Sequence, residues 1–101
     1  MNTWTFQRKN DNTYTLSGTL TYETVPAIWQ QSQNTFKDLK HSVTFDLSEV
    51  TQSDSSGVAL LISWIRNFHR QSQTVYFTYL PSQMLAIIQL AGLNTIVPTK
   101  K

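Results

Sequence analysis

Residues 42–68 read SVTFDLSEVTQSDSSGVALLISWIRNF, and this stretch decides the fold. Val43, Phe45 and Leu47 stand at every second position, which is the spacing of side chains that share one face of a β-strand. We expect this strand to be buried and to stop at residues 48–49, where polar side chains begin. Beyond the polar residues the apolar positions change to helical spacing. The stretch therefore predicts a buried strand, a short polar turn and a helix.

The helix is expected to begin just before Val58, so the polar residues Asp54, Ser55 and Ser56 lie at its N-terminus. The first four N–H groups of a helix have no partner within it, and Asp or Ser side chains accept hydrogen bonds from them. The same end carries a partial positive charge and suits a carboxylate or a phosphate. Two interpretations stay open. Either Ser53 or Asp54 simply caps the helix, or one of the serines is modified or faces a partner.

Segment 46–66, DLSEVTQSDSSGVALLISWIR, resembles the signature of the STAS domain family, which includes anti-sigma-factor antagonists and a subunit of a bacterial lipid transporter. In that signature a strand ending in Asp-Leu-Ser leads to Asp-Ser-Ser-Gly or Asp-Thr-Gly-Gly and then to an apolar helix. The resemblance implies the α/β STAS fold, a mostly parallel mixed sheet with an N-terminal antiparallel hairpin and about three to four helices. It covers nearly the full length, so a single STAS domain is expected over residues 1–101.

The rest of the chain fits the same alternation of strands and helices. Residues 3–6 and 14–16 are rich in β-formers and flank the turn-forming segment 8–12, which predicts an antiparallel hairpin. Gly18 is free to take a positive φ where the chain leaves the sheet. Before the central strand and helix we expect a helix that begins at residues 23–26 and ends at 37–39. After them we expect a strand over 74–80 and a helix that begins at 81–83 and ends at Gly92. A short last strand is expected at Leu93, Ile96 and Val97.

The composition is that of a small folded domain. The chain has 101 residues, of which 40% are hydrophobic and 12% aromatic, and its formal net charge is +2. No basic stripe with interleaved aromatic residues is present, so nucleic acid is not expected as a partner. Residues 1–10 lack the apolar core of a signal peptide, and the longest apolar run, residues 58–62, is far short of the ~20 residues that span a bilayer. We expect a cytoplasmic protein that does not insert into a membrane.

No catalytic centre, metal site or cofactor is expected. A serine hydrolase needs a general base within about 3 Å of its serine. His69 follows Ser56 by 13 residues on the same helix, which separates them by about 20 Å, and His41 is expected at the surface. The three glycines form no phosphate-binding loop. Asp46 and Asp54 have no His or Glu at a ligand spacing, and the chain has no cysteine for a disulfide or a thiolate metal site.

The central helix is apolar on two sides. A first stripe consists of Val58, Leu61, Ile62 and Ile65, and a second consists of Leu60, Trp64 and Phe68. The first has the spacing i, i+3, i+4 and i+7, which is enough to pack a helix on a sheet. The second fits either a wide core face or an interface with another protein, in which Trp64 would be a typical anchor. Both alternatives stay open.

Two branches of the STAS family fit the motif at the helix N-terminus. Resemblance to the anti-sigma-factor antagonists implies that Ser56, the second serine of Asp-Ser-Ser-Gly, accepts phosphate from a partner kinase and that the chain binds an anti-sigma factor. The STAS subunit of Mla phospholipid transporters has the pattern Asp-Thr-Gly-Gly-Leu-Ala-Leu, in which the threonine falls on Ser55 and the first glycine on Ser56. Gly57, Ala59 and Leu60 match that pattern outright.

The Mla-type branch is favoured because the likeness to it extends over nearly the whole chain. It implies a non-catalytic subunit that binds the cytoplasmic ABC ATPase subunit, and through it the permease, in a system that maintains outer-membrane lipid asymmetry. The antagonist branch is the alternative. Under either branch the expected partner-binding residues are Asp54, Ser55, Ser56, Gly57, Leu60 and Trp64.

Overall fold

The computed structural model describes residues 3–37, 41–94 and 97. Within these ranges the elements are β1 (Trp4–Arg8), β2 (Thr13–Leu20), α1 (Val25–Phe36), β3 (Val43–Ser53), α2 (Ser55–Arg70), β4 (Val75–Thr78) and α3 (Ser82–Leu90). The strands form one sheet in the order β1-β2-β3-β4. The first pair is antiparallel and the other two pairs are parallel. The predicted mixed sheet with a leading hairpin and three helices is confirmed.

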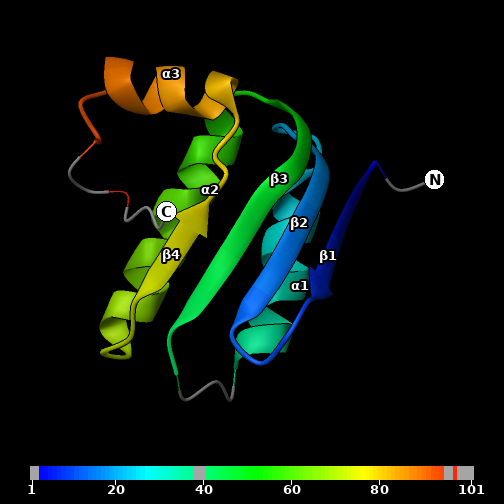
Figure 1. The fold of residues 1–101 in the computed structure, drawn as a ribbon, viewed down its shortest axis with the longest axis vertical. Coiled ribbons are helices and arrows are strands. Elements are labelled where there is room, and N and C mark those ends of the chain that lie inside the picture. The colour runs from blue at the N-terminus through cyan, green and yellow to red at the C-terminus, as the bar shows by residue number, and fades with distance from the viewer. Residues whose placement is uncertain (1–2, 38–40, 95–96, 98–101) are drawn as a thin grey trace.

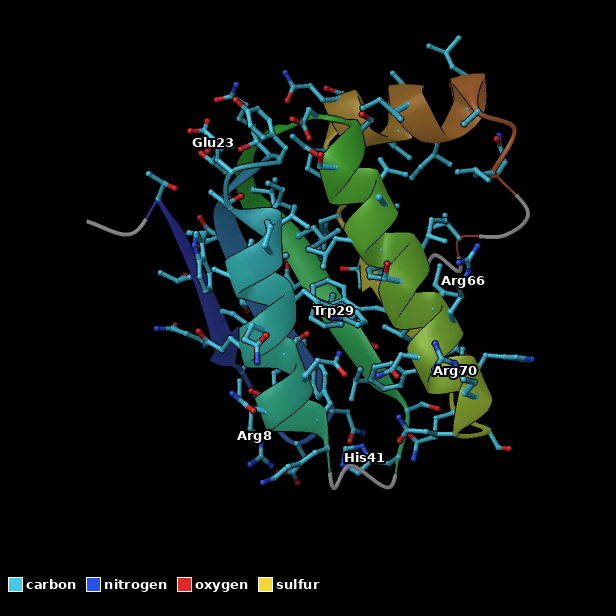
Figure 2. The ribbon with its side chains drawn as sticks, turned by 180° about the vertical axis from the view of Figure 1, so that it is seen from behind. Arg8, Glu23, Trp29, His41, Arg66 and Arg70 are labelled. Atoms are coloured by element: carbon cyan, nitrogen blue, oxygen red, sulfur yellow. The ribbon has the colours of Figure 1, made fainter. Side chains whose placement is uncertain are left out.

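The elements form a sheet layer and a helix layer (Figure 1). Helices α1 and α2 lie side by side on one face of the sheet, with α1 behind β1 and β2 and α2 behind β3 and β4, as both views show (Figures 1 and 2). Helix α3 lies across the edge of the sheet at which β3 ends, next to the first turn of α2. The N-terminus of α2 and the helix α3 therefore meet at one edge of the molecule.

Strand β3 is longer than the sequence predicts. It continues to Ser53, whereas the change to polar residues predicts an end at residues 48–49. Its second half stays paired with β2, up to Ser53 opposite Leu20, across two shifts in register. Residues 48–52 are exposed except for Val50, which is buried. The predicted turn is wrong because a polar run can continue a strand when its backbone finds a partner and its side chains reach solvent.

The core between the sheet and the two helices is rich in aromatic rings. Phe45 of β3 stacks on Trp64 of α2, with ring centroids 4.2 Å apart and planes inclined by 11°. The indole N–H of Trp64 donates a 2.9 Å hydrogen bond to the hydroxyl of Ser32 in α1. That hydroxyl in turn donates to the Trp29 carbonyl oxygen at 2.7 Å. A buried chain of hydrogen bonds therefore joins α1 to α2.

The second apolar stripe of α2 belongs to the core. Leu60 and Phe68 are each 2% exposed, and Trp64 is fully buried. The interface alternative for this stripe is therefore wrong, and neither Leu60 nor Trp64 is available to a docking partner. The reason is that α2 packs against both the sheet and α1, so that two of its sides are enclosed (Figure 2).

Helix α3 ends as predicted, at a glycine in the left-handed conformation, Gly92 with φ 71°. The N–H groups of Gly92 and Leu93 donate to carbonyl oxygens in the last turn of the helix, which is the pattern of a Schellman cap. The predicted final strand is not found at Leu93 or Val97, and Ile96 lies outside the described residues. The Val97 N–H donates to the Leu93 carbonyl oxygen, so these two residues bond locally and not along the sheet.

Asp46 of β3 is a buried carboxylate that contacts donors on Ser48 and Lys9. The Ser48 N–H donates to its Oδ1 at 2.9 Å, and the Lys9 Nζ lies 3.3 Å from its Oδ2. Burial acts to raise the pKa of Asp46, but the hydrogen bonds with Ser48 and the contact with Lys9 outweigh it and hold this pKa below its ordinary value.

A lowered pKa makes the contribution of Asp46 to stability depend on pH. The ionised carboxylate stabilises the folded chain above the pKa of the unfolded state, and this stabilisation is lost as the pH falls through the folded pKa. We therefore expect Asp46→Asn to lower the free energy of unfolding at neutral pH, and the deficit to shrink below a pH of about 4. Urea unfolding at a series of pH values measures it. A deficit that stays constant over that range would contradict the expectation.

Candidate partner-binding site

The N-terminus of α2 is capped by Asp54. Its Oδ1 accepts a 2.8 Å hydrogen bond from the N–H of Ser56, and its Oδ2 accepts one of 3.4 Å from the N–H of Tyr22 in the loop after β2. The Asp54 N–H donates to the Leu20 carbonyl oxygen at 3.1 Å. Of the two predicted caps, Ser53 and Asp54, the structure selects Asp54. Its carboxylate also ties the helix to the end of β2.

Gly57 lies where α2 presses against the sheet. A Cβ atom added at Gly57 would lie 2.4 Å from the Ser53 hydroxyl and 3.1 Å from the Cβ of Leu20. Gly57 is buried, so its predicted role as a partner contact is wrong. The missing side chain instead lets the helix approach the strand. The Ser53 N–H donates to the Gln83 side chain at 3.0 Å, which joins the first turn of α3 to the same edge.

Ser55 is the most accessible of the predicted site residues. It is the first residue of α2 and is exposed, whereas Asp54 and Ser56 beside it are half-buried. Tyr22, whose N–H contacts Asp54, is 73% exposed. The edge therefore presents a hydroxyl and an aromatic ring next to a helix end, a set of groups suited to contact with another molecule. His69 lies in the last turn of α2, far from both serines.

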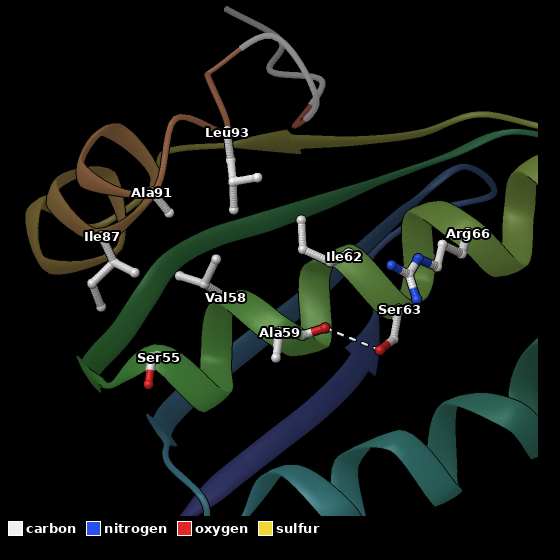
Figure 3. Close-up of a pocket in the computed structure, with 9 residues that line it drawn as sticks. All are labelled: Ser55, Val58, Ala59, Ile62, Ser63, Arg66, Ile87, Ala91 and Leu93. Atoms are coloured by element: carbon white, nitrogen blue, oxygen red, sulfur yellow. Dashed lines mark hydrogen bonds between the residues drawn. The ribbon is translucent and has the colours of Figure 1, made fainter.

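A groove between α2 and α3 opens beside Ser55 (Figure 3). Its volume is about 420 Å³. The lining residues are Ser55, Val58, Ala59, Ile62, Ser63 and Arg66 from α2, with Ile87, Ala91 and Leu93 from α3 and the residues after it. The sequence shows apolar rows on both helices, but it does not show the groove, because the gap depends on how α3 crosses α2.

No candidate metal site is found in the described part of the chain. Within it, no three His, Cys, Asp or Glu side chains come together where they could hold an ion. In the same residues, no helix has both the length and the apolar character that crossing a membrane requires. What the edge of the sheet offers is a capped helix end and the groove beside it.

Two comparisons by sequence identify relatives over nearly the whole chain. The family model described as Mlab, STAS domain matches residues 5–98. The intermembrane phospholipid transport system binding protein MlaB of Haemophilus influenzae is 34% identical over 97 residues, which cover 90% of this chain and 90% of that protein. The residues matched by the family model include the capped end of α2 and the groove.

Solved structures with the same fold include anti-sigma factor antagonists. Unphosphorylated SpoIIAA superposes with a TM-score of 0.74 at 16% identity, over 97% of this chain and 88% of that one. An antagonist from Mycobacterium paratuberculosis superposes with a TM-score of 0.76 at 21% identity, over 96% of this chain and 83% of that one. At these identities the likeness concerns the fold alone. Because the family model spans nearly all of the sequence and the MlaB relative shares a third of its residues, the chain belongs to the STAS domain family, in the group described as Mlab.

Proposed function

We propose that this chain is the non-catalytic STAS subunit of an Mla-type phospholipid transport system. In this role it binds the cytoplasmic ABC ATPase subunit at the inner face of the inner membrane and supports the transport that keeps the outer membrane asymmetric. The observation that carries the proposal is the 34% identity to MlaB over 90% of both chains. The phosphate-accepting role of an antagonist is supported more weakly, by likeness in fold and by one serine.

The surface proposed for the ATPase subunit is the N-terminal end of α2. Ser55 is exposed there, with the half-buried Asp54 and Ser56 beside it. Asp54 uses its carboxylate to hold the first turn, so the position of the Ser55 hydroxyl is set by a hydrogen-bonded cap and not by a mobile loop. A rigid polar group at the edge of a surface suits specific recognition of a partner.

Ser55→Arg is expected to weaken binding of the ATPase subunit at least about tenfold while the fold persists. The longer side chain blocks close approach, and its charge meets the positive end of the helix, at a cost of only about 0.3–1 kcal/mol in stability. Isothermal titration with the purified ATPase subunit measures the affinity, and circular dichroism during heating reports the fold. Gln30→Arg, at an exposed position of α1, is the matched control. A folded Ser55→Arg chain with unchanged affinity would refute the proposed surface.

A second candidate function rests on Ser56. A hydroxyl stands there, where the Mla-type pattern has glycine, and its own N–H is already bound by Asp54. Phosphate on this residue would add about −1.5 to −2 charges next to the Asp54 carboxylate and repel a docked partner. Affinity purification of the chain from its native cell, with mass spectrometry of the partners and of the Ser55–Ser56 peptide, decides between the two. An ATPase with an unmodified peptide supports the transporter subunit, and a kinase with phosphorylated Ser56 supports the antagonist.

A further inference from the structure

The groove between α2 and α3 has apolar walls and polar ends. Val58 and Ile62 form one wall, and Ile87 and Leu93 line the other. These side chains range from buried to half-buried, and the groove is open to solvent along one side. From Ser55 to Arg66 it follows α2 for 11 residues, or about 16 Å. That length equals about three turns of a helix laid along it.

Arg66 supplies a cation at the end of the groove away from Ser55 (Figure 3). Its side chain is exposed, and neither of the two ion pairs found in the described residues includes it. The neighbouring Ser63 hydroxyl is uncharged and donates to the Ala59 carbonyl oxygen of its own helix. No carboxylate is among the lining residues. The groove therefore complements a ligand that is apolar along its length and negatively charged at one end.

Helix α3 also carries an exposed apolar side chain, Leu90, between the groove residues Ile87 and Ala91 in sequence. Leu90 is 90% exposed, the largest exposed fraction among the big apolar side chains of the described residues. It is three residues after Ile87, so the two side chains lie on adjacent rows of the helix surface. Leu90 is not among the residues that line the groove, so a partner covers it only by extending past Ile87 over the surface of α3. An open apolar groove is typical of a docking surface for an amphipathic helix.

We propose that the groove binds an amphipathic helix of the ATPase subunit, with its apolar side chains between α2 and α3 and a carboxylate paired with Arg66. This inference rests on the proposed function, because it assigns the partner by continuity with the Ser55 surface. A helical segment fits better than a free acyl chain, because small-molecule sites enclose most of their ligand whereas this groove is open on one side. The guanidinium selects an acidic segment and gives the contact a direction along α2.

Two variants test the groove without removing core contacts. Ala59→Trp fills it from the α2 side at an exposed position, and Arg66→Glu reverses its charge. Each is expected to weaken binding of the purified ATPase subunit at least about tenfold, and the effect of Arg66→Glu should diminish as the salt concentration rises. Ala27→Trp on α1 and Arg70→Glu one turn farther along α2 are matched exposed controls, and they are expected to bind as the wild type does.

The outcomes separate this inference from the proposed function. If Ser55→Arg weakens binding but Ala59→Trp and Arg66→Glu behave as their controls do, the groove proposal is overturned and the proposed function stands. If the wild-type chain does not bind the ATPase subunit at all, both are overturned. Native mass spectrometry of the free chain tests whether the groove is instead occupied by a second copy of the chain or by a small molecule. If the free chain is a dimer that Ala59→Trp dissociates, or carries a fatty acid that Ala59→Trp displaces, the groove binds that occupant and the proposal is overturned.

Discussion

Trp64→Ala is expected to lower the free energy of unfolding by about 3–5 kcal/mol, which is a large share of the roughly 5–15 kcal/mol that stabilises a domain of this size. The indole is fully buried and stacks on Phe45 at 4.2 Å. Truncation to alanine leaves a cavity where α2, α1 and the sheet meet. It also leaves the buried Ser32 hydroxyl without the donor that now bonds to it at 2.9 Å. Urea unfolding followed by circular dichroism measures the loss.

Trp64→Phe separates the two contributions. It keeps an aromatic ring against Phe45 but removes the N–H, so we expect a loss of about 1–3 kcal/mol. Ser32→Ala combined with Trp64→Phe should cost less than the sum of the two single changes, since both remove the same hydrogen bond. A Trp64→Ala chain that unfolds at the wild-type urea concentration would contradict the core assignment.

The strands and helices with regular apolar spacing could be predicted because their signal is local. The hairpin, the three helices and the cap at Gly92 can each be predicted from residues that are close together in the sequence. The extent of β3 could not be predicted in this way. Residues 48–52 look like a turn by their polarity, and they stay in a strand only because β2 pairs with them across two register shifts. That pairing is a contact between distant parts of the sequence.

The candidate site also has features that the sequence predicts and features that it does not. The placement of Asp54, Ser55 and Ser56 at a helix N-terminus could be read from the change of period at Val58. The burial of Trp64 could not, because the spacing shows that a second side of α2 is apolar but not that α1 covers it. Its hydrogen-bond partner on α1 has no signal of its own in the sequence.

The groove was also beyond the sequence. Its walls come from the apolar rows of α2 and α3, each of which predicts burial when taken alone. Only the crossing of the two helices leaves a gap between the rows, with Ser55 at one end and Arg66 at the other. The Gln83 side chain, which accepts a hydrogen bond from the Ser53 N–H, joins the first turn of α3 to the same edge.

Gly18→Ala is expected to be the most damaging small substitution in the hairpin, with a loss of at least about 3 kcal/mol. Gly18 has φ 93°, a conformation that side-chain-bearing residues rarely adopt. A Cβ atom there would lie 2.0 Å from the carbonyl oxygen of Thr3, which is backbone and accepts a 2.9 Å hydrogen bond from the Thr19 N–H. Relief of the clash requires the backbone at Thr3 and Trp4 to move away from β2, and within the described residues β1 pairs with no other strand.

Gly92→Ala is the matched control for that substitution. Gly92 has a similar left-handed backbone, φ 71°, but a Cβ atom added there meets nothing within 4 Å. Its substitution should therefore cost only the conformational term, about 1–2 kcal/mol. The difference in unfolding free energy between the two variants isolates the contact with Thr3. Equal losses would mean that β1 moves aside without cost and that its pairing contributes little to stability. A larger loss for Gly18→Ala would show that the close approach of Thr3 to β2 contributes to stability.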